Sequence, residues 1–235
     1  MSFLRDSKKA CFVNEKNKKK LIFVAVAVGR CGSSMVVGML ERAGVNAGVN
    51  PCHSKSVSNP GGFYETRGIL KFLYDYYYDH MNAFKPMFSF EKLRDKDLLP
   101  KYLDILKHDY DDKYPMAVKA LDYLPIAMFE NEKDYDIRVV YVTRKLEDQA
   151  KSIRGMWSNK GPTYEWWCDW LKERYAWADI FRDEIKFPYL GVDFNDVLDH
   201  PREEAEKMLK FCDIEAKNLD EIEKWINPKY SRSRT

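Results

Sequence analysis

The side chains best suited to binding an anion follow directly after an apolar run at residues 21–28. This glycine turn consists of Gly29, Arg30, Cys31, Gly32, Ser33 and Ser34. A helical apolar pattern begins at its end, and the first amides of a helix have no partner within the helix and lie at the positive end of its dipole. A guanidinium and two hydroxyls add charge and hydrogen bonds. The glycine turn therefore predicts an anion site, with phosphate as the expected occupant.

A second pair of anion-binding groups follows another apolar run, at residues 137–143. Arg144 stands where that run ends, and Ser152 comes eight residues later, about two helical turns along. A guanidinium fork suits a phosphate dianion, and a hydroxyl can add a bond. Ligands of open parallel sheets bind beyond the carboxyl ends of the strands, so Arg144 should lie beside the glycine turn if the two strands are near neighbours. The structural alternatives are a surface salt bridge for Arg144 and an idle helix hydroxyl for Ser152.

Short apolar, β-branched runs predict buried strands that would position these groups. The expected strands are 21–28, 115–119, 137–143 and 189–192. Helices are expected at 35–43, closed by Gly44, at 66–80, capped by Thr66, and at 98–112, 125–133, 146–157, 162–185 and 201–212. Because strands alternate with helices, we predict one α/β domain at 21–235, with a mostly parallel central sheet flanked by helices. The polar stretch 1–20 is expected to be an N-terminal arm.

Composition narrows the class of protein. The 235 residues are 45% hydrophobic and 14% aromatic, as in a globular protein. A net charge of +2 gives no reason to expect nucleic acid. Five cysteines without paired spacing indicate reduced thiols and no zinc site. The polar N-terminus is unlike a signal peptide, and the run 21–28 is too short to cross a bilayer. We therefore expect a cytoplasmic protein with no membrane span.

The glycine turn resembles the 5′-phosphosulfate loop of sulfotransferases that use 3′-phosphoadenosine 5′-phosphosulfate (PAPS), commonly [KR]-S-G-T-[ST], with Cys31 replacing the first Ser. Arg144 and Ser152 resemble the 3′-phosphate element of that family, strand-Arg-x7-Ser. Weaker likenesses at 59–65, 118–119 and 189–214 extend the match over about residues 20–230. The resemblance implies a P-loop NTPase-like sulfotransferase fold. It also implies transfer of a sulfuryl group from PAPS to a hydroxyl or amine, giving adenosine 3′,5′-bisphosphate without a metal.

The resemblance also implies roles in catalysis. Arg30 would stabilise the charge that grows on the oxygen bridging to the leaving phosphate, together with the Ser33 and Ser34 amides. Lys119 would be a second such cation, the alternative being a strand-end lysine that reaches water.

A base must take the acceptor proton. Cytosolic members of the family have a His two residues after the strand-end Lys, where this chain has Leu121. Glu65 is the first candidate, His53 the second and Asp122 the third. The alternative for Glu65 is a carboxylate that serves the start of a helix.

Two other functions stay open. A nucleotide kinase would need a Walker A loop. That pattern requires Gly at position 27 and Lys at position 33, where this chain has Ala27 and Ser33. The second alternative is a nucleotide-binding protein without catalytic activity, because Leu121 replaces the His of the cytosolic family members. The acceptor would be a small molecule or a glycan, bound by aromatic side chains. The candidates for this groove are Tyr74, Tyr76, Tyr77, Tyr78, Trp157, Trp166 and Trp167.

Overall fold

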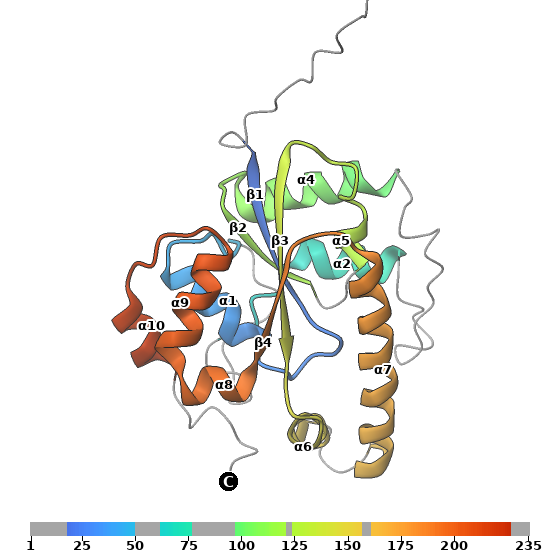
Figure 1. Cartoon of the computed structure of the whole chain (residues 1–235). Helices are drawn as coiled ribbons and strands as arrows, with labels where there is room; N and C mark the ends of the chain where they lie inside the picture. Colours follow the sequence, from blue (N-terminus) through green and yellow to red (C-terminus); the bar gives the residue numbers. More distant parts are fainter. Residues whose placement is uncertain (1–17, 50–61, 77–96, 121–123, 157–160, 227–235) are drawn as a thin grey trace, which may run out of the picture.

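The computed structural model describes residues 18–49, 62–76, 97–120, 124–156 and 161–226 (Figure 1). Its central sheet has four parallel strands in the order β2-β1-β3-β4. The strands are β1 (Lys19–Ala25), β2 (Met116–Ala120), β3 (Tyr135–Thr143) and β4 (Tyr189–Asp193). The predicted α/β class and the parallel sheet are confirmed.

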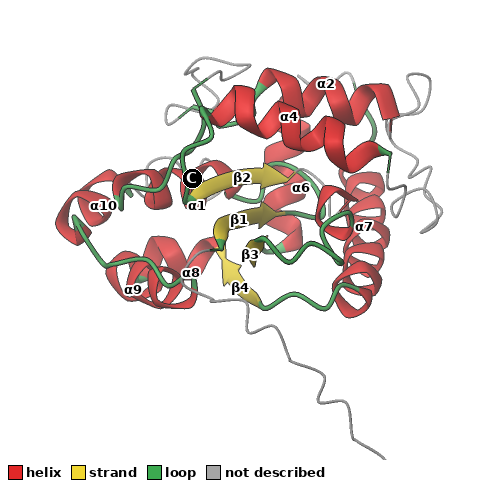
Figure 2. Ribbon diagram, turned by 90° about the horizontal axis from the view of Figure 1, so that it is seen from above, coloured by secondary structure: helices red, strands yellow, loops and turns green. Residues whose placement is uncertain are grey.

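Helices cover both faces of this sheet, as the view from above shows (Figure 2). One face packs against α1 (Ser33–Arg42), α8 (Phe194–Asp199), α9 (Pro201–Phe211) and α10 (Leu219–Trp225). The other packs against α2 (Arg67–Tyr76), α4 (Leu98–Tyr110), α5 (Leu124–Ala127) and α7 (Tyr164–Glu184). α6 (Leu146–Met156) packs on α7. Successive side chains of β1 alternate between the two cores, since Phe23 enters one and Val24 the other.

Several predicted boundaries differ from the structure. β1 begins two residues earlier than expected and ends at Ala25, so 26–28 belong to the connection before the glycine turn. α5 has four residues instead of the nine predicted at 125–133. The apolar pattern there comes from a turn whose Phe129 is fully buried and lies 5.6 Å, ring to ring, from Phe23. The helices α8 and α10 were not predicted.

The start of α2 is capped from another helix. The sequence predicted Thr66 as the cap, and this is wrong, because its buried hydroxyl has no hydrogen-bond partner in the described part of the chain. The amide of Gly68 donates instead to Oδ2 of Asp109 in α4, at 2.9 Å. Asp109 is only 1% exposed, so the first turn of α2 is held against α4 by a buried carboxylate.

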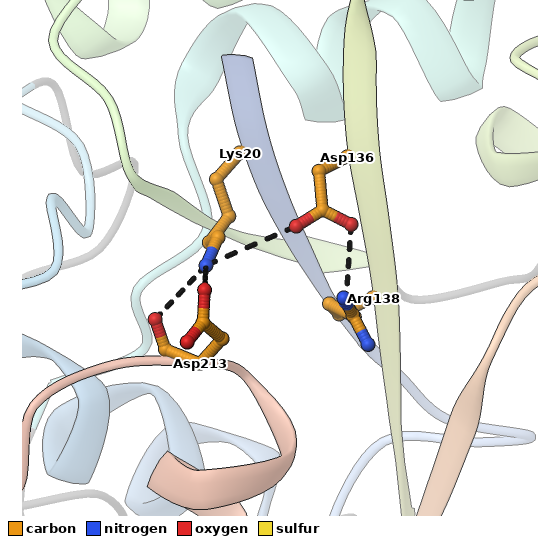
Figure 3. A network of polar contacts seen from close by, with 4 residues as sticks. All are labelled: Lys20, Asp136, Arg138 and Asp213. Carbon is orange, nitrogen blue, oxygen red and sulfur yellow. Dashed lines mark hydrogen bonds and ion pairs between the residues drawn. The ribbon is translucent and has the colours of Figure 1, made fainter. Parts of the chain in front are cut away.

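A polar network ties the starts of β1 and β3 to the end of α9 (Figure 3). Nζ of Lys20 lies 2.7 Å from Oδ2 and 2.9 Å from the backbone oxygen of Asp213, and 3.8 Å from Oδ2 of Asp136. Nε of Arg138 donates to Asp136 at 3.0 Å. This network lies at the edge of the sheet where the strands begin, so Lys20 fastens α9 to the sheet at the end opposite the predicted ligand edge.

Candidate functional site

The strand order brings the two predicted anion-binding elements together. β1 lies between β2 and β3, so the chain crosses from one side of β1 to the other between β2 and β3. Ligand sites of open α/β sheets form at such switch points, beyond the carboxyl ends of the strands. Nη1 of Arg144, just after β3, donates to the backbone oxygen of Arg30 in the glycine turn at 3.2 Å. The predicted proximity is therefore confirmed.

The glycine turn needs its second glycine for two reasons. Gly32 has a φ of 103°, in the left-handed region that disfavours a side chain. A Cβ atom there would lie 2.2 Å from the ring of Phe194. The carbonyl of Gly32 accepts from the amides of Met35 and Val36 and so starts α1. Gly32 thus lets the turn pass into the helix while a ring from α8 packs against its backbone.

Arg30 of the glycine turn contacts the helix that follows Arg144, and Arg144 contacts the glycine turn. Nε of Arg30 donates to Oγ of Ser152 in α6, at 3.3 Å. The guanidinium of Arg144 lies 4.3 Å from the centre of the Phe194 ring. Burial lowers the pKa of Arg144, and the carboxylate of Asp148 offsets part of that effect. Neither alternative holds for the pair, since Arg144 is buried rather than part of a surface salt bridge and Ser152 is hydrogen-bonded.

A second polar cluster forms where β2 ends. Nζ of Lys119 donates to Oε1 of Glu65 at 2.7 Å, to the backbone oxygen of Phe63 at 2.8 Å and to Oγ of Ser34 at 3.0 Å. Ser34 also donates to Phe63, at 3.2 Å. The side chain of Lys119 is 4% exposed, so the alternative of a lysine that reaches water is wrong. The cluster joins the end of β2, the first turn of α1 and the segment before α2.

The remaining candidates fall into two groups. Cys31 and Ser33 are buried in the glycine turn. Burial raises the pKa of the Cys31 thiol, and a hydrogen bond from the Ser33 backbone offsets part of the rise, so the thiol stays neutral. His53 and Asp122 lie outside the described residues. The same is true of the position of Leu121.

The aromatic candidates for an acceptor groove are dispersed. Trp167 is 1% exposed and packs in the core between α6 and α7, so its predicted place in a groove is wrong. Trp166 and Tyr74 are exposed, but they belong to α7 and α2 respectively. Tyr76 packs against Phe72. Tyr77, Tyr78 and Trp157 lie outside the described residues.

Three residues of the site were missed by the sequence reasoning. Phe194 contacts both Gly32 and Arg144. Gln149 of α6 donates to the backbone oxygens of Val28 and Gly29, at 3.1 and 2.9 Å. Tyr175 of α7 donates to Gln149. One signal was available for Gln149, because it is a polar residue on the apolar face of its helix.

The described part of the chain holds no group of three His, Cys, Asp or Glu side chains placed to bind a metal ion. No helix within the described ranges has the length and apolar character needed to cross a membrane. Comparison with known proteins adds no family, since the sequence matches no protein-family model and has no significant match among curated proteins.

Proposed function

We propose that this protein is a PAPS-dependent sulfotransferase with a P-loop NTPase-like fold. It would transfer a sulfuryl group from PAPS to a hydroxyl or amine of a small-molecule or glycan acceptor, and release adenosine 3′,5′-bisphosphate. The observation that carries the proposal is the hydrogen bond between Arg30 and Ser152, 122 residues apart in the chain. It joins two elements whose sequences resemble the two phosphate-binding elements of that family.

Each element supplies donors for one anionic group of the nucleotide. The glycine turn and the first amides of α1 would hold the 5′-phosphosulfate, since a helix start favours negative charge. Arg144 and Ser152 would hold the 3′-phosphate. The fit is supported by the burial of Arg144, because a guanidinium withdrawn from water gains most from an anionic ligand. ATP lacks the 3′-phosphate, so these residues also give a basis for choosing between nucleotides.

The chemistry would take place between Arg30 and the Lys119 cluster. The acceptor oxygen or nitrogen forms a bond to sulfur while the bond from sulfur to the bridging phosphate oxygen breaks. Arg30 and Lys119 would stabilise the charge that develops on the bridging oxygen. Glu65 would take the acceptor proton, with its carboxylate held by Lys119 at 2.7 Å. These roles make Arg30, Lys119 and Glu65 the proposed catalytic residues.

Thermal unfolding with two nucleotides tests the proposed ligand. Adenosine 3′,5′-bisphosphate at a hundredfold excess over Kd should stabilise the native state by about 2.7 kcal/mol. ATP at the same concentration should do much less. Arg144→Ala should remove most of the difference, because a charge-assisted phosphate contact is worth about 1.5–3 kcal/mol. Lys145→Ala is the matched control, since Lys145 is the next residue along the chain and is exposed.

The reaction itself is tested with radiolabelled PAPS and a panel of phenol, alcohol, amine and glycan acceptors. Transfer of label to an acceptor without added metal would support the proposal. Equal stabilisation by ATP and the bisphosphate would contradict it. Phosphate transfer from ATP in the presence of magnesium would favour a nucleotide kinase, and tight binding of the bisphosphate without any transfer would favour a nucleotide-binding protein.

A further inference from the structure

A buried amide side chain from α6 holds the backbone at the start of the glycine turn. Gln149 is fully buried, and its Nε2 donates to the carbonyls of Val28 and Gly29. Its Oε1 accepts from the hydroxyl of Tyr175 in α7, at 2.6 Å. Because the two carbonyls can only accept, the Nε2 end of the amide must face them, and the Oε1 end is left to accept from Tyr175. The nitrogen therefore faces the turn and the oxygen faces α7.

The hydroxyl that orients this amide is itself fixed. Burial raises the pKa of Tyr175, and a hydrogen bond from the Arg144 backbone offsets part of the rise. The phenol therefore stays protonated and donates to Gln149. A chain of hydrogen bonds thus runs from Tyr175 of α7 through Gln149 of α6 to the glycine turn.

The hydrogen bonds from Gln149 to the carbonyls of Val28 and Gly29 determine the direction of the amides that follow each carbonyl. In a trans peptide the C=O of one residue and the N–H of the next point in opposite directions. The described residues have a single cis bond, between Tyr114 and Pro115, so the peptides of the turn are trans. The amides of Gly29 and Arg30 therefore point away from Gln149. Since Arg144 holds the carbonyl of Arg30, the amide of Cys31 points away from Arg144.

We propose that Gln149, oriented by Tyr175, is a positioning residue that directs the Gly29 and Arg30 amides toward the bound anion. Successive amides turned the same way form a concave anion site, which supplements the start of α1. The inference rests on the proposed function, because the anion is taken to be the 5′-phosphosulfate or 5′-phosphate group of the nucleotide. Gln149 itself touches the backbone of the turn and would not touch the ligand.

The burial of an amide on an apolar helix face supports a specific role. Gln149 lies between Leu146 and Ile153, and Ala150 beside it packs in the small core with Trp167. An apolar side chain would fill this place without the cost of desolvating an amide. That cost is offset only by partners with good geometry, which the two carbonyls and Tyr175 provide.

The first test measures affinity by calorimetry for adenosine 3′,5′-bisphosphate and for inorganic pyrophosphate. Gln149→Leu, which removes the donors at similar volume, should weaken both anions at least tenfold. Tyr175→Phe keeps the amide and removes only its orienting hydroxyl, so it should weaken both about threefold. Ile153→Val is the matched control, because Ile153 is buried on the same helix and contributes to the same core. It should leave both affinities within twofold of the wild type.

A second variant separates positioning from packing. Gln149→Glu introduces a carboxyl whose pKa burial would raise. Protonated, it can donate to one carbonyl of the turn. Ionised, it repels both. The anion affinity of Gln149→Glu, divided by that of Gln149→Leu, should therefore be highest at acidic pH and fall as pH rises. The titratable and charged groups around the site are common to both variants, so their direct effects on the anion cancel in this ratio and they act only through the pKa of the introduced carboxyl. They are Arg30, Cys31, Tyr141, Arg144, Asp148, Tyr175 and Asp193.

The outcomes distinguish this inference from the proposed function. If the wild type binds neither anion, both are wrong. If it binds the bisphosphate and Gln149→Leu binds it as tightly, the positioning role alone is wrong. Losses in Gln149→Leu and Ile153→Val of the same size would also overturn it, since packing would then explain them. Should Gln149→Leu fail to fold, unchanged affinity in Tyr175→Phe together with a flat pH profile for Gln149→Glu would count against the role.

Discussion

Nζ of Lys119 lies 2.7 Å from Oε1 of Glu65, and the two side chains are 4% and 13% exposed. The residues are 54 positions apart in the chain, so the pair joins the end of β2 to the segment before α2. Removing one partner of a buried ion pair leaves a charge without compensation, which costs about 3–5 kcal/mol. The cation and the proposed base are therefore placed together by the fold, and variants of either must keep a polar partner for the other.

Glu65→Gln satisfies that condition, because an amide oxygen can still accept from Lys119. We expect the variant to fold and to bind adenosine 3′,5′-bisphosphate like the wild type. Its kcat should fall about 10²–10⁴-fold, the usual contribution of a general base. The loss should be smaller for acidic phenols, which need less help in losing a proton. The measurement is kcat for both proteins across acceptors of differing pKa.

Glu41→Gln provides the control for this experiment. Glu41 accepts from the hydroxyl of Tyr64 at 2.7 Å and so contacts the same segment from outside the Lys119 cluster. It should leave kcat within about twofold of the wild type. A uniform loss below about threefold in Glu65→Gln would assign the base to His53, Asp122 or water and leave Glu65 a structural role as the partner of Lys119.

Arg30→Ala should lower turnover more than it weakens the product complex. The guanidinium would act most strongly when charge builds on the bridging oxygen, so we expect kcat to fall about 10²–10³-fold. The Kd of the bisphosphate should rise much less. Arg154→Ala is the control, since Arg154 is exposed on the helix that carries Ser152. A wild-type kcat in Arg30→Ala with any good acceptor would leave Arg30 as a ground-state anion ligand only.

Gly32→Ala should damage both stability and anion binding. The added Cβ would strain a backbone at φ 103° and meet the Phe194 ring. Strain of this kind costs about 1–3 kcal/mol, so the urea midpoint should fall clearly. For stability, Gly29→Ala is the matched control within the same turn, because a Cβ there meets nothing within 4 Å. Equal stability losses in the two variants would show that the Phe194 contact does not constrain Gly32.

The Lys20–Asp213 contact predicts a pH-dependent contribution to stability. The hydrogen bond from Lys20 lowers the pKa of Asp213 below its ordinary value. A carboxyl whose folded pKa is depressed stabilises the protein above its unfolded pKa, and this contribution disappears as pH falls through the folded pKa. Asp213→Asn should therefore lose at most about 1 kcal/mol at pH 7, as exposed pairs do, and almost nothing near pH 2. Urea unfolding at both pH values measures this.

Glu215→Gln is the comparison for that experiment. Glu215 pairs with Lys217, two residues away, and its side chain is exposed. This pair joins no distant elements, so its loss should change stability little at either pH. If Asp213→Asn lost as much stability near pH 2 as at pH 7, the charge of Asp213 would not be the cause.

The elements carried by local signals could be predicted from the sequence. β1, the glycine turn and α1 follow from a β-branched run, a glycine that must adopt a positive φ, and a helical apolar face. Arg144 could be placed at the ligand edge because it directly follows a strand. What the sequence could not give was the order of the strands, and the contact of Arg144 with the turn depends on β1 and β3 being neighbours.

Features that depend on distant partners were missed. α8 and α10 have six and seven residues, too few to be stable alone, so packing on the core decides whether they form. Thr66 has a capping residue type and directly precedes the helix, yet Asp109 from a distant helix accepts the amide at that helix start. The pairing of Glu65 with Lys119 and the binding of two loop carbonyls by Gln149 likewise required the tertiary structure.

Phe194 allows a last prediction, since its ring packs between Gly32 and Arg144. A guanidinium over an aromatic face at 4.3 Å is held in orientation by an interaction worth about 0.5–2 kcal/mol. Phe194→Leu keeps an apolar side chain but removes the π-face. We therefore expect the Kd of adenosine 3′,5′-bisphosphate to rise about 3- to 10-fold, while inorganic pyrophosphate, which has no 3′-phosphate for Arg144 to bind, is affected less.

The control lies one turn further along α8. Leu198 is 5% exposed, as Phe194 is, so Leu198→Val removes a comparable apolar contact from the same helix. Leu198→Val should change the Kd of the two anions by the same factor, which should be less than twofold. A selective loss of bisphosphate affinity in Phe194→Leu alone would tie the ring to the orientation of Arg144. Equal losses for both anions would instead place the effect at the glycine turn, because the same ring packs against Gly32.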